Sequence, residues 1–400
     1  MSEWCDYKLG DIAEYVSRGI SPKYVENNGI PVINQKCIRG GAISLDLIKY
    51  QDKEKKHANE KNVHNDDILI NSTGVGTAGR VAIFRQTGKV FADSHISILR
   101  LNRNIAHPLF VYYNLRKRET EIEGYAEGST GQIELSREKV KKIDVTLPPL
   151  PEQKAIAAVL SSLDDKIDLL HRQNKTLESM AETLFRHWFI EEAHEGWIDT
   201  TLDCHSEVMR GLSYKGSGLS DSGFGIPMHN LNSIYEGGGY KEVGIKYYRD
   251  TFKERHLVRN GEIIVANTEQ GHEFKLIGCP AIVPSFYGEK GLFSQHIYRV
   301  ILKEKSYLTT EYLYYLLLTP SVREQIISAT NGSTVNMLAI DGLQRPKFKL
   351  PPKEKVVEFS ELVKSWWKKK DVNHLQLRTL EKLRDTLLPK LMSGEVTVIN

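Results

Sequence analysis

The chain has 400 residues, of which 40% are hydrophobic and 26% are charged. This composition is typical of a globular chain of about two to three domains. No apolar run reaches the roughly 18 residues that a membrane helix needs, and the opening residues MSEWCDYKLG lack the pattern of a signal peptide. We therefore expect a cytoplasmic protein with no membrane partner. The formal net charge is only +3, so a polyanionic partner would need basic residues gathered locally.

Four cysteines are scattered along the chain without any CxxC pair. This spacing argues against a structural zinc site and suits a reducing compartment. We expect no metal site in the chain. The cysteines are Cys5, Cys37, Cys204 and Cys279.

Residues 1–147 are predicted to form a first globular domain of mixed α/β structure. The runs ILIN from Ile68 and VAIF from Val81 are bounded by Gly, Asn or Asp, as short strands commonly are. The segment 107–123 places aliphatic and aromatic residues at steps of three and four, which predicts a helix.

Residues 148–192 are predicted to form a helical spacer. Prolines open the helix, where a missing N–H costs nothing. Apolar positions then alternate steps of four and three residues, which is the seam of a coiled coil. A polar residue, Asn174, stands in that seam and is expected to fix register or orientation. The predicted seam positions are Leu163, Ile167, Leu170, Asn174, Leu177, Ala181 and Leu184.

Residues 193–350 repeat the design of the first domain. GIPMHN at Gly225 matches GIPVIN at Gly29, and GEIIVANTE at Gly261 matches DDILINSTG at Asp66. The strand-like runs EIIVA and IYRVIL and the helix-like segment LTTEYLYYLLL follow in the same order. The offset between the copies drifts, as insertions in loops require.

Residues 351–400 are predicted to form a second helical spacer. LPPKEKV at its start corresponds to LPPLPEQ at the start of the first spacer. The offset between the two copies is the same for Leu147 and Leu350 as for Glu178 and Glu381. The predicted seam positions of this spacer are Trp366, Leu377, Leu380 and Leu387.

The order domain, helix, domain, helix indicates duplicated domains rather than a solenoid. Because a whole domain separates the helices, an antiparallel pair is the natural closure. The predicted fold class is α+β, with two globular α/β domains in tandem, separated and joined by two long helices that form an antiparallel coiled coil. The alternative is two separate amphipathic helices, each covering its own domain.

This arrangement resembles the specificity subunit of type I restriction-modification systems, in which two target-recognition domains alternate with two helical spacers. The strings LPPLPEQKAIAAVLSSLDDKID, NKTLESMAETLFRHWF, LPPKEKV and TLLPKLMSGEV carry the resemblance, and it covers essentially the whole chain. The predicted domains resemble the family through GIPVIN, DDILINSTG and the GST turn, which occurs at Gly128 and at Gly332.

The resemblance implies a non-catalytic chain that recognises double-stranded DNA. It further implies two methyltransferase subunits as partners, which carry S-adenosylmethionine, and an ATP- and Mg-dependent restriction subunit; this chain itself would hold no cofactor. Two unlike domains held apart by rods also predict a bipartite target whose half-sites differ. Aromatic residues of the spacers are expected either in subunit docking or in packing between the helices, namely Phe185, Trp188, Phe189, Trp366 and Trp367.

Polar and basic side chains after the strand-like runs are the candidate DNA contacts, because their types bond base edges and phosphates. Ordinary turn capping and loop solvation are the competing explanation for each, and a buried core role is the alternative for His95. Candidates in the first domain are Lys23, Asn34, Gln35, Lys36, Arg39, Ser72, Thr73, Thr77, Arg80, His95, Ser129, Thr130 and Gln132. Candidates in the second domain are Tyr214, Lys215, His229, Asn230, Asn232, Asn267, Glu269, Gln270, His272, His296, Ser333, Thr334 and Asn336.

Enzyme motifs receive little support from the sequence. Residues 74–79 fit G-x-G-x-x-G, but a strand-like run follows where a dinucleotide site needs a helix. Glu262 with Glu273 and Lys275 faintly resembles a nuclease set, and the first domain has no equivalent. We therefore expect no catalysis by the chain. The alternatives are a coiled-coil interaction adaptor that binds no DNA, or a nuclease with a hidden site in the second domain.

Overall fold

The computed structural model of the chain describes residues 4–26, 28–128, 133–271, 273–332 and 335–398. It contains two compact units, Met1–Asp168 with Arg378–Asn400, and Leu169–Leu377. Each unit mixes helices and strands, so the predicted α+β class is confirmed. The division between the units cuts both long helices, whereas the predicted domains kept each helix whole as a spacer.

The first unit is built on an antiparallel four-stranded sheet in the order β2-β11-β8-β9. A second sheet, β10-β4-β7-β3, contains the parallel pair β10 and β4. Two smaller pairs are β1 with β12 and β5 with β6. The strands are β1 Cys5–Lys8, β2 Ala13–Arg18, β3 Tyr24–Val25, β4 Ile30–Ile33, β5 Ile38–Arg39, β6 Ala42–Ile43, β7 Lys49–Gln51, β8 Ile68–Asn71, β9 Val81–Ile83, β10 Phe91–Ala92, β11 Ile96–Leu101 and β12 Asp144–Leu147.

Short helices cover the first unit's central sheet. The predicted helix after residue 107 is confirmed as α2, which starts with a proline at its first turn and buries Phe110, Tyr112 and Tyr113. A proline is tolerated there because its missing N–H would have no helical partner. The helices are α1 Leu9–Ile12, α2 Pro108–Lys117, α3 Glu119–Glu123 and α4 Arg137–Lys141.

The second unit repeats this topology. Its central sheet has the order β14-β23-β19-β21, again antiparallel, and a second sheet again holds a parallel pair, β16 and β22. The duplication read from the sequence is therefore present in the central sheet and in the sheet with the parallel pair, which has one more strand, β18, in the second unit. The strands are β13 Ile198–Thr201, β14 Ser206–Arg210, β15 Leu219–Ser220, β16 Ile226–His229, β17 Lys246–Tyr248, β18 Leu257–Arg259, β19 Ile263–Ala266, β20 Thr268–Gln270, β21 Pro280–Ile282, β22 Lys290–Phe293, β23 Ile297–Leu302, β24 Thr330–Asn331, β25 Val335–Leu338 and β26 Lys347–Leu350.

The short helices of the second unit are α6 Leu202–His205, α7 Thr310–Leu318, α8 Pro320–Ser328 and α9 Ile340–Gln344. Helix α7 corresponds to α2 and buries Tyr314 and Tyr315 as α2 buries its two tyrosines. A pair of bulky rings thus faces the interior at the same place in each unit.

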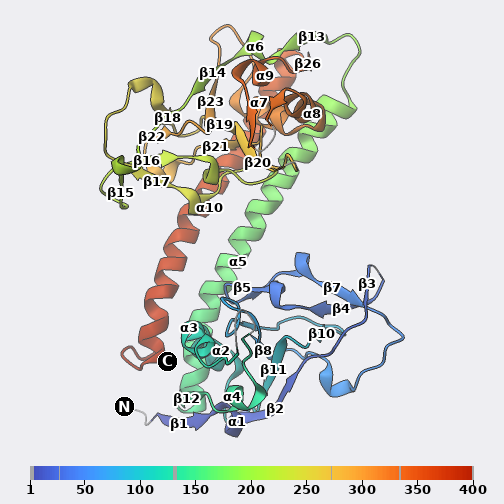
Figure 1. Cartoon of the computed structure of the whole chain (residues 1–400), viewed down its shortest axis with the longest axis vertical. Coiled ribbons are helices and arrows are strands. Elements are labelled where there is room, and N and C mark those ends of the chain that lie inside the picture. The colour runs from blue at the N-terminus through green and yellow to red at the C-terminus, as the bar shows by residue number, and fades with distance from the viewer. Residues whose placement is uncertain (1–3, 27, 129–132, 272, 333–334, 399–400) are drawn as a thin grey trace. The chain divides into compact units, whose positions relative to one another are not determined.

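Two long helices, α5 (Leu150–Arg186) and α10 (Lys353–Met392), follow the two domains in sequence (Figure 1). Each starts within a few residues of the prolines that the sequence identified. A π-helical turn, His187–Glu191, extends α5. Both units contain a piece of each helix. Each unit is therefore built from segments that lie far apart in the sequence.

Within the first unit, the start of α5 and the end of α10 share one hydrophobic core. Ile156, Ala157 and Leu160 of α5 are buried in it together with Leu391 and Met392 of α10. Asp164 of α5 contacts Arg384 of α10, so early residues of one helix meet late residues of the other.

Within the second unit, the order of contact is the same. The end of α5 meets the start of α10, since Phe185 packs on Phe359 with ring centroids 5.5 Å apart. Glu178 forms an ion pair with Lys370. Later residues of α5 thus contact earlier residues of α10. The helices therefore run antiparallel, as predicted.

A buried pair of asparagines lies between the helices in the second unit. The Nδ2 atom of Asn373 donates to Oδ1 of Asn174 at 2.8 Å, and both side chains are buried. A hydrogen-bonded polar pair in an apolar seam favours one register, because a shifted helix would bury each amide without a partner. Asn373 was not among the predicted seam residues.

All the predicted seam positions are buried or half-buried. Five of them are buried, namely Ile167, Leu170, Asn174, Ala181 and Leu377. The others are half-buried, namely Leu163, Leu177, Leu184, Trp366, Leu380 and Leu387.

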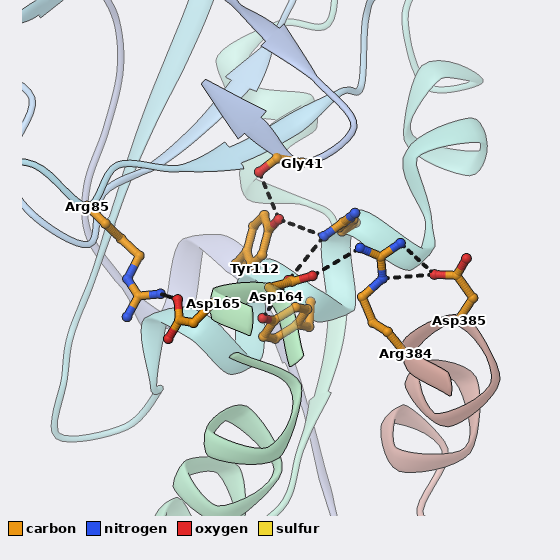
Figure 2. A network of polar contacts seen from close by, with 9 residues as sticks. Gly41, Arg85, Tyr112, Asp164, Asp165, Arg384 and Asp385 are labelled. Carbon is orange, nitrogen blue, oxygen red and sulfur yellow. Dashed lines mark hydrogen bonds and ion pairs between the residues drawn. The ribbon is translucent and has the colours of Figure 1, made fainter. Parts of the chain in front are cut away.

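A polar network ties α2 to both long helices inside the first unit (Figure 2). The carboxylate of Asp164 accepts from the Tyr113 hydroxyl at 2.8 Å and from Arg384 at 3.0 Å. Arg116 lies 3.3 Å from the same carboxylate and also donates to Tyr112. Burial and the neighbouring carboxylate raise the pKa of Tyr113, so its hydroxyl keeps the proton that it donates.

The second unit builds the corresponding junction from rings. Trp367 of α10 corresponds to Asp164 in the sequence repeat. Its Nε1 donates to the Tyr315 hydroxyl at 3.3 Å, and its ring meets Tyr314 edge-on at 5.4 Å. The same position in the repeat therefore uses charge in one unit and aromatic packing in the other.

Asp164→Ala is expected to lower the opening free energy of α2 by about 2 kcal/mol, because two arginines and a hydroxyl lose one partly buried acceptor. Native-state hydrogen exchange of residues 108–117 measures this. The control is Asp165→Ala, which removes a carboxylate that is 64% exposed and pairs with Arg85; we expect a change near zero. Equal effects of the two substitutions would contradict the assigned role of Asp164.

Candidate nucleic-acid interface

Both units place polar side chains at the end of a buried central strand. In the first, β8 is buried throughout and is followed by Ser72 and Thr73. In the second, β19 is buried throughout and is followed by Asn267 and Thr268. Side chains at the end of a strand that is fixed on both faces are held more firmly than side chains on a free loop.

A threonine–histidine hydrogen bond occurs at this place in both units. Thr73 Oγ1 lies 3.0 Å from His95 Nδ1, and Thr268 Oγ1 lies 3.2 Å from His296 Nδ1. Both histidines are exposed. This exposure excludes the core role that was the alternative for His95, and it leaves both rings accessible from solvent.

The neighbours of this pair differ between the units. In the first, Thr73 Oγ1 also donates to Gln35 Oε1 at 2.9 Å. In the second, Gln295 Nε2 lies 3.2 Å from His296 Nε2, whereas the residue before His95 is Ser94. A shared scaffold therefore presents different polar atoms to solvent in the two units.

Other candidates are exposed on their units. Lys36 directly follows Gln35, and Asn232 occupies the corresponding position in the second unit. Lys23 is exposed and forms an ion pair with Asp52 at 2.7 Å. The remaining exposed candidates are Arg39, Lys215 and Gln270.

Asn34 and Asn230 have the same structural task in the two units. Each is buried and caps a single 3₁₀ turn, accepting from the backbone N–H of Lys36 at 2.9 Å and of Asn232 at 3.0 Å respectively. Their amide nitrogens donate to backbone oxygens. Turn capping, the competing explanation in the sequence, accounts for both, so we leave them out of the proposed DNA surface.

Three further candidates are buried and bonded to protein groups. Ser72 Oγ contacts Ser97 Oγ at 2.8 Å. The amide of Asn267 donates to the backbone oxygen of Gln295 at 3.0 Å, and the amide of Asn336 donates to a backbone oxygen. These three side chains are therefore bonded within the protein and are not presented to solvent.

Glu269 is a buried carboxylate that holds the loop after β20. It is 8% exposed, and its oxygens accept from the backbone N–H groups of Lys275, Leu276 and Ile277 at 2.8 to 2.9 Å. Three such bonds satisfy an anion that burial alone would penalise. The corresponding residue of the first unit is Gly74, so this loop support belongs to one unit.

His229 lies in the core of the second unit. Its ring is fully buried, and its Nδ1 lies 2.7 Å from the Tyr240 hydroxyl. Gly291 packs so closely that a Cβ there would lie 2.7 Å from His229 Nε2. Burial lowers the pKa of His229 to about 4, so the ring is neutral at neutral pH. The corresponding residue of the first unit, Ile33, is also buried.

The three remaining described candidates are half-buried in local contacts. Thr77 donates to backbone oxygens in its own loop. Arg80 donates to the backbone oxygen of Gly76 at 2.6 Å, and Tyr214 accepts from Lys246 at 2.8 Å. Six candidates lie outside the described residues, namely Ser129, Thr130, Gln132, His272, Ser333 and Thr334.

The loop with the G-x-G-x-x-G pattern leads into strand β9 rather than into a helix. The backbone N–H of Gly76 already donates to the carboxylate of Glu123 at 2.5 Å. A pyrophosphate would need this N–H and a following helix, so the context of a dinucleotide site is missing. Glu262, the acid considered for a nuclease, is held in a two-pronged ion pair by Arg299.

Gln295 was missed by the sequence reading. The sequence does indicate this residue. FADSHIS from Phe91 and FSQHIY from Phe293 align at their histidines, and this alignment pairs Ser94 with Gln295. A difference beside a shared residue marks where two copies of one scaffold diverge.

The chain belongs to the family of type I restriction-modification DNA specificity domains, whose family model matches residues 1–179 and 224–382. It is similar to the MjaIX specificity subunit of Methanocaldococcus jannaschii, with 28% identity over 72% of this chain and 69% of that protein. It is also similar to the HindI specificity subunit of Haemophilus influenzae, with 23% identity over 99% and 100%. A crystal structure of a type I S subunit from M. genitalium shares the fold, with a TM-score of 0.66, 17% identity and coverage of 98% and 96%.

This membership makes the chain a DNA-sequence specificity subunit, in agreement with the resemblance read from the sequence. Within the described ranges, no helix is both long and apolar enough to cross a membrane. The same ranges hold no group of three or more His, Cys, Asp or Glu side chains placed to bind a metal ion.

The second unit is expected to lose stability as pH falls from about 6.5 toward 4, through His229. The folded pKa of about 4 lies below the unfolded value of about 6.5, so the unfolded chain binds a proton that the folded chain refuses. At pH 5 the loss is about 2 kcal/mol. His229→Ile, which copies the first unit, should flatten this share of the slope in urea unfolding at pH 5 and pH 7. An unchanged slope would show that other groups carry the pH dependence.

Proposed function

We propose that the chain reads a bipartite, asymmetric DNA target, one half-site with each unit. The observation that carries this proposal is the repeated threonine–histidine pair, which has the same geometry in both units and different neighbours. Equivalent scaffolds with unlike surface atoms are suited to unlike half-sites. Exposed Lys36 and Arg39 in the first unit, and Lys215 in the second, supply local positive charge for phosphates, which gives salt-dependent affinity.

The long helices are proposed as the ruler and as the docking surface. Two methyltransferase subunits carrying S-adenosylmethionine, and a restriction subunit using ATP and Mg, would bind there, while this chain catalyses nothing and holds no cofactor. Phe185 and Phe189 are buried in the second unit's core, and Trp188, Trp366 and Trp367 are half-buried against it, so packing explains these aromatics. Exposed apolar side chains are better docking candidates, namely Met180, Leu362, Val372 and Leu375.

N6-methyladenine mapping tests the function directly. Genomic DNA from cells that express the chain with its neighbouring methyltransferase is expected to carry a two-part, non-palindromic methylated motif, absent when the chain is omitted. Exchanging residues 1–148 for the first domain of another family member should change one half of the motif only. A motif that forms without the chain, or that changes in both halves, would refute modular reading. Duplex binding at moderate salt separates this function from a DNA-free adaptor.

Removing seven residues from each long helix should shorten the gap between the half-sites by about 3 base pairs. A helix rises about 1.5 Å per residue, so one heptad spans about 10 Å and keeps the apolar face in phase. The shortened chain is mapped by the same methylation sequencing, with a chain carrying seven charge-conserving substitutions at charged helix positions as the control. An unchanged gap in the shortened chain would mean that the helices do not set the spacing.

A further inference from the structure

The hydrogen bonds around the threonine–histidine pair define which ring nitrogen carries the proton. A threonine hydroxyl has a single proton to donate. In the first unit, Thr73 gives that proton to Gln35 Oε1, so the hydroxyl must accept from His95 Nδ1. The neutral His95 ring therefore carries its proton on Nδ1 and turns an acceptor, Nε2, away from the pair.

The second unit has the same tautomer for a different reason. The amide nitrogen of Gln295 can only donate, and it lies 3.2 Å from His296 Nε2. The neutral ring therefore accepts at Nε2 and donates from Nδ1 to Thr268. The Nε2 acceptor of the histidine is therefore uncovered in the first unit, whereas the amide of Gln295 covers it in the second unit.

The backbone of Gln295 is also held from both sides. Its N–H donates to the oxygen of Leu212 at 2.9 Å, and its oxygen accepts from the buried amide of Asn267 at 3.0 Å. The side chain is nevertheless exposed. Among the described residues, its Oε1 and its second amide hydrogen have no partner, so one acceptor and one donor are presented side by side in a fixed direction.

We propose that Gln295 reads an adenine in the second half-site, and that His296 is the residue that positions it. An acceptor beside a donor matches the N6 amine and N7 of adenine in the major groove, and this bidentate pairing discriminates against other bases. Ordering the long side chain before binding lowers the entropic cost of the contact. The inference rests on the proposed function and names one specificity-determining side chain within it.

The first unit presents a different atom at the same place. Ser94 stands where Gln295 stands, and it is too short to cover the ring of His95. The uncovered Nε2 of His95 is a single acceptor, which suits an exocyclic amine of adenine or cytosine. The two half-sites thus differ at this position because of one residue beside an otherwise shared pair.

Gln295→Glu tests the proposal, because a carboxylate only accepts and favours the N4 amine of cytosine. Methylated motifs are mapped in cells that express each variant with the methyltransferase. We expect one base pair of the second half-site to change from adenine toward cytosine, with at least tenfold less methylation of the original motif and an unchanged first half-site. His296→Ala should relax the choice at that same base pair. The control Gln86→Glu makes the same chemical change on an exposed loop position of the first unit, outside the long helices and the candidate DNA contacts, and should leave the motif intact.

The outcomes separate this inference from the function on which it rests. If the wild-type chain directs a two-part motif and Gln295→Glu directs the same motif equally well, Gln295 reads no base and the function stands. If no motif depends on the wild-type chain, both fall. If Gln295→Glu abolishes all methylation, Gln295→Ala is tested on duplexes substituted at each base pair. Relaxation at one base pair supports the proposal, and uniform weakening overturns it.

Discussion

The antiparallel contact between α5 and α10 is the constraint on which the rest of the chain depends. Each globular unit exposes an apolar face that its own domain cannot cover, and each covers it with pieces of both helices. Leu391 and Met392, near the end of the chain, are buried against a core that begins at Leu9. The first unit is therefore completed only when the last helix is in place, and folding of the chain links its two ends.

The sequence repeat predicted which residues of the two helices are equivalent. It could not predict which residues contact each other across the helix pair. Asn174 and Leu377 are equivalent because they stand at the same step of two copies of one helix. In an antiparallel pair, however, a residue meets a partner that runs in the opposite direction, and Asn174 faces Asn373. Periodicity shows which face of a helix is apolar; the register comes from which polar groups can satisfy each other across the seam.

Candidate site residues were predicted from the chemistry of their side chains. That chemistry alone did not distinguish exposed side chains from buried side chains that hold the fold. Asn34 and Asn230 look like base-reading residues, but both are buried and cap 3₁₀ turns. Glu269 is charged, yet three backbone N–H groups form a cradle for it. These partners lie in loops whose conformation no local pattern specifies, so the sequence could not reveal them. What it did reveal was the shared histidine, because the same residue recurs in two copies whose surroundings have diverged.

The helix–domain junctions at Asp164 and at Trp367 help to prevent misassembly of the duplicated chain. Repeated domains invite misassembly, because a helix segment from one copy resembles the segment that the other copy needs. Here the exchange is chemically penalised. Trp367 placed where Asp164 belongs would leave Arg116 and the Tyr113 hydroxyl without their acceptor, and Asp164 placed among Tyr314 and Tyr315 would bury a carboxylate among rings. Charge at one junction and aromatic packing at the other thus favour the pairing of each unit with its own helix segments.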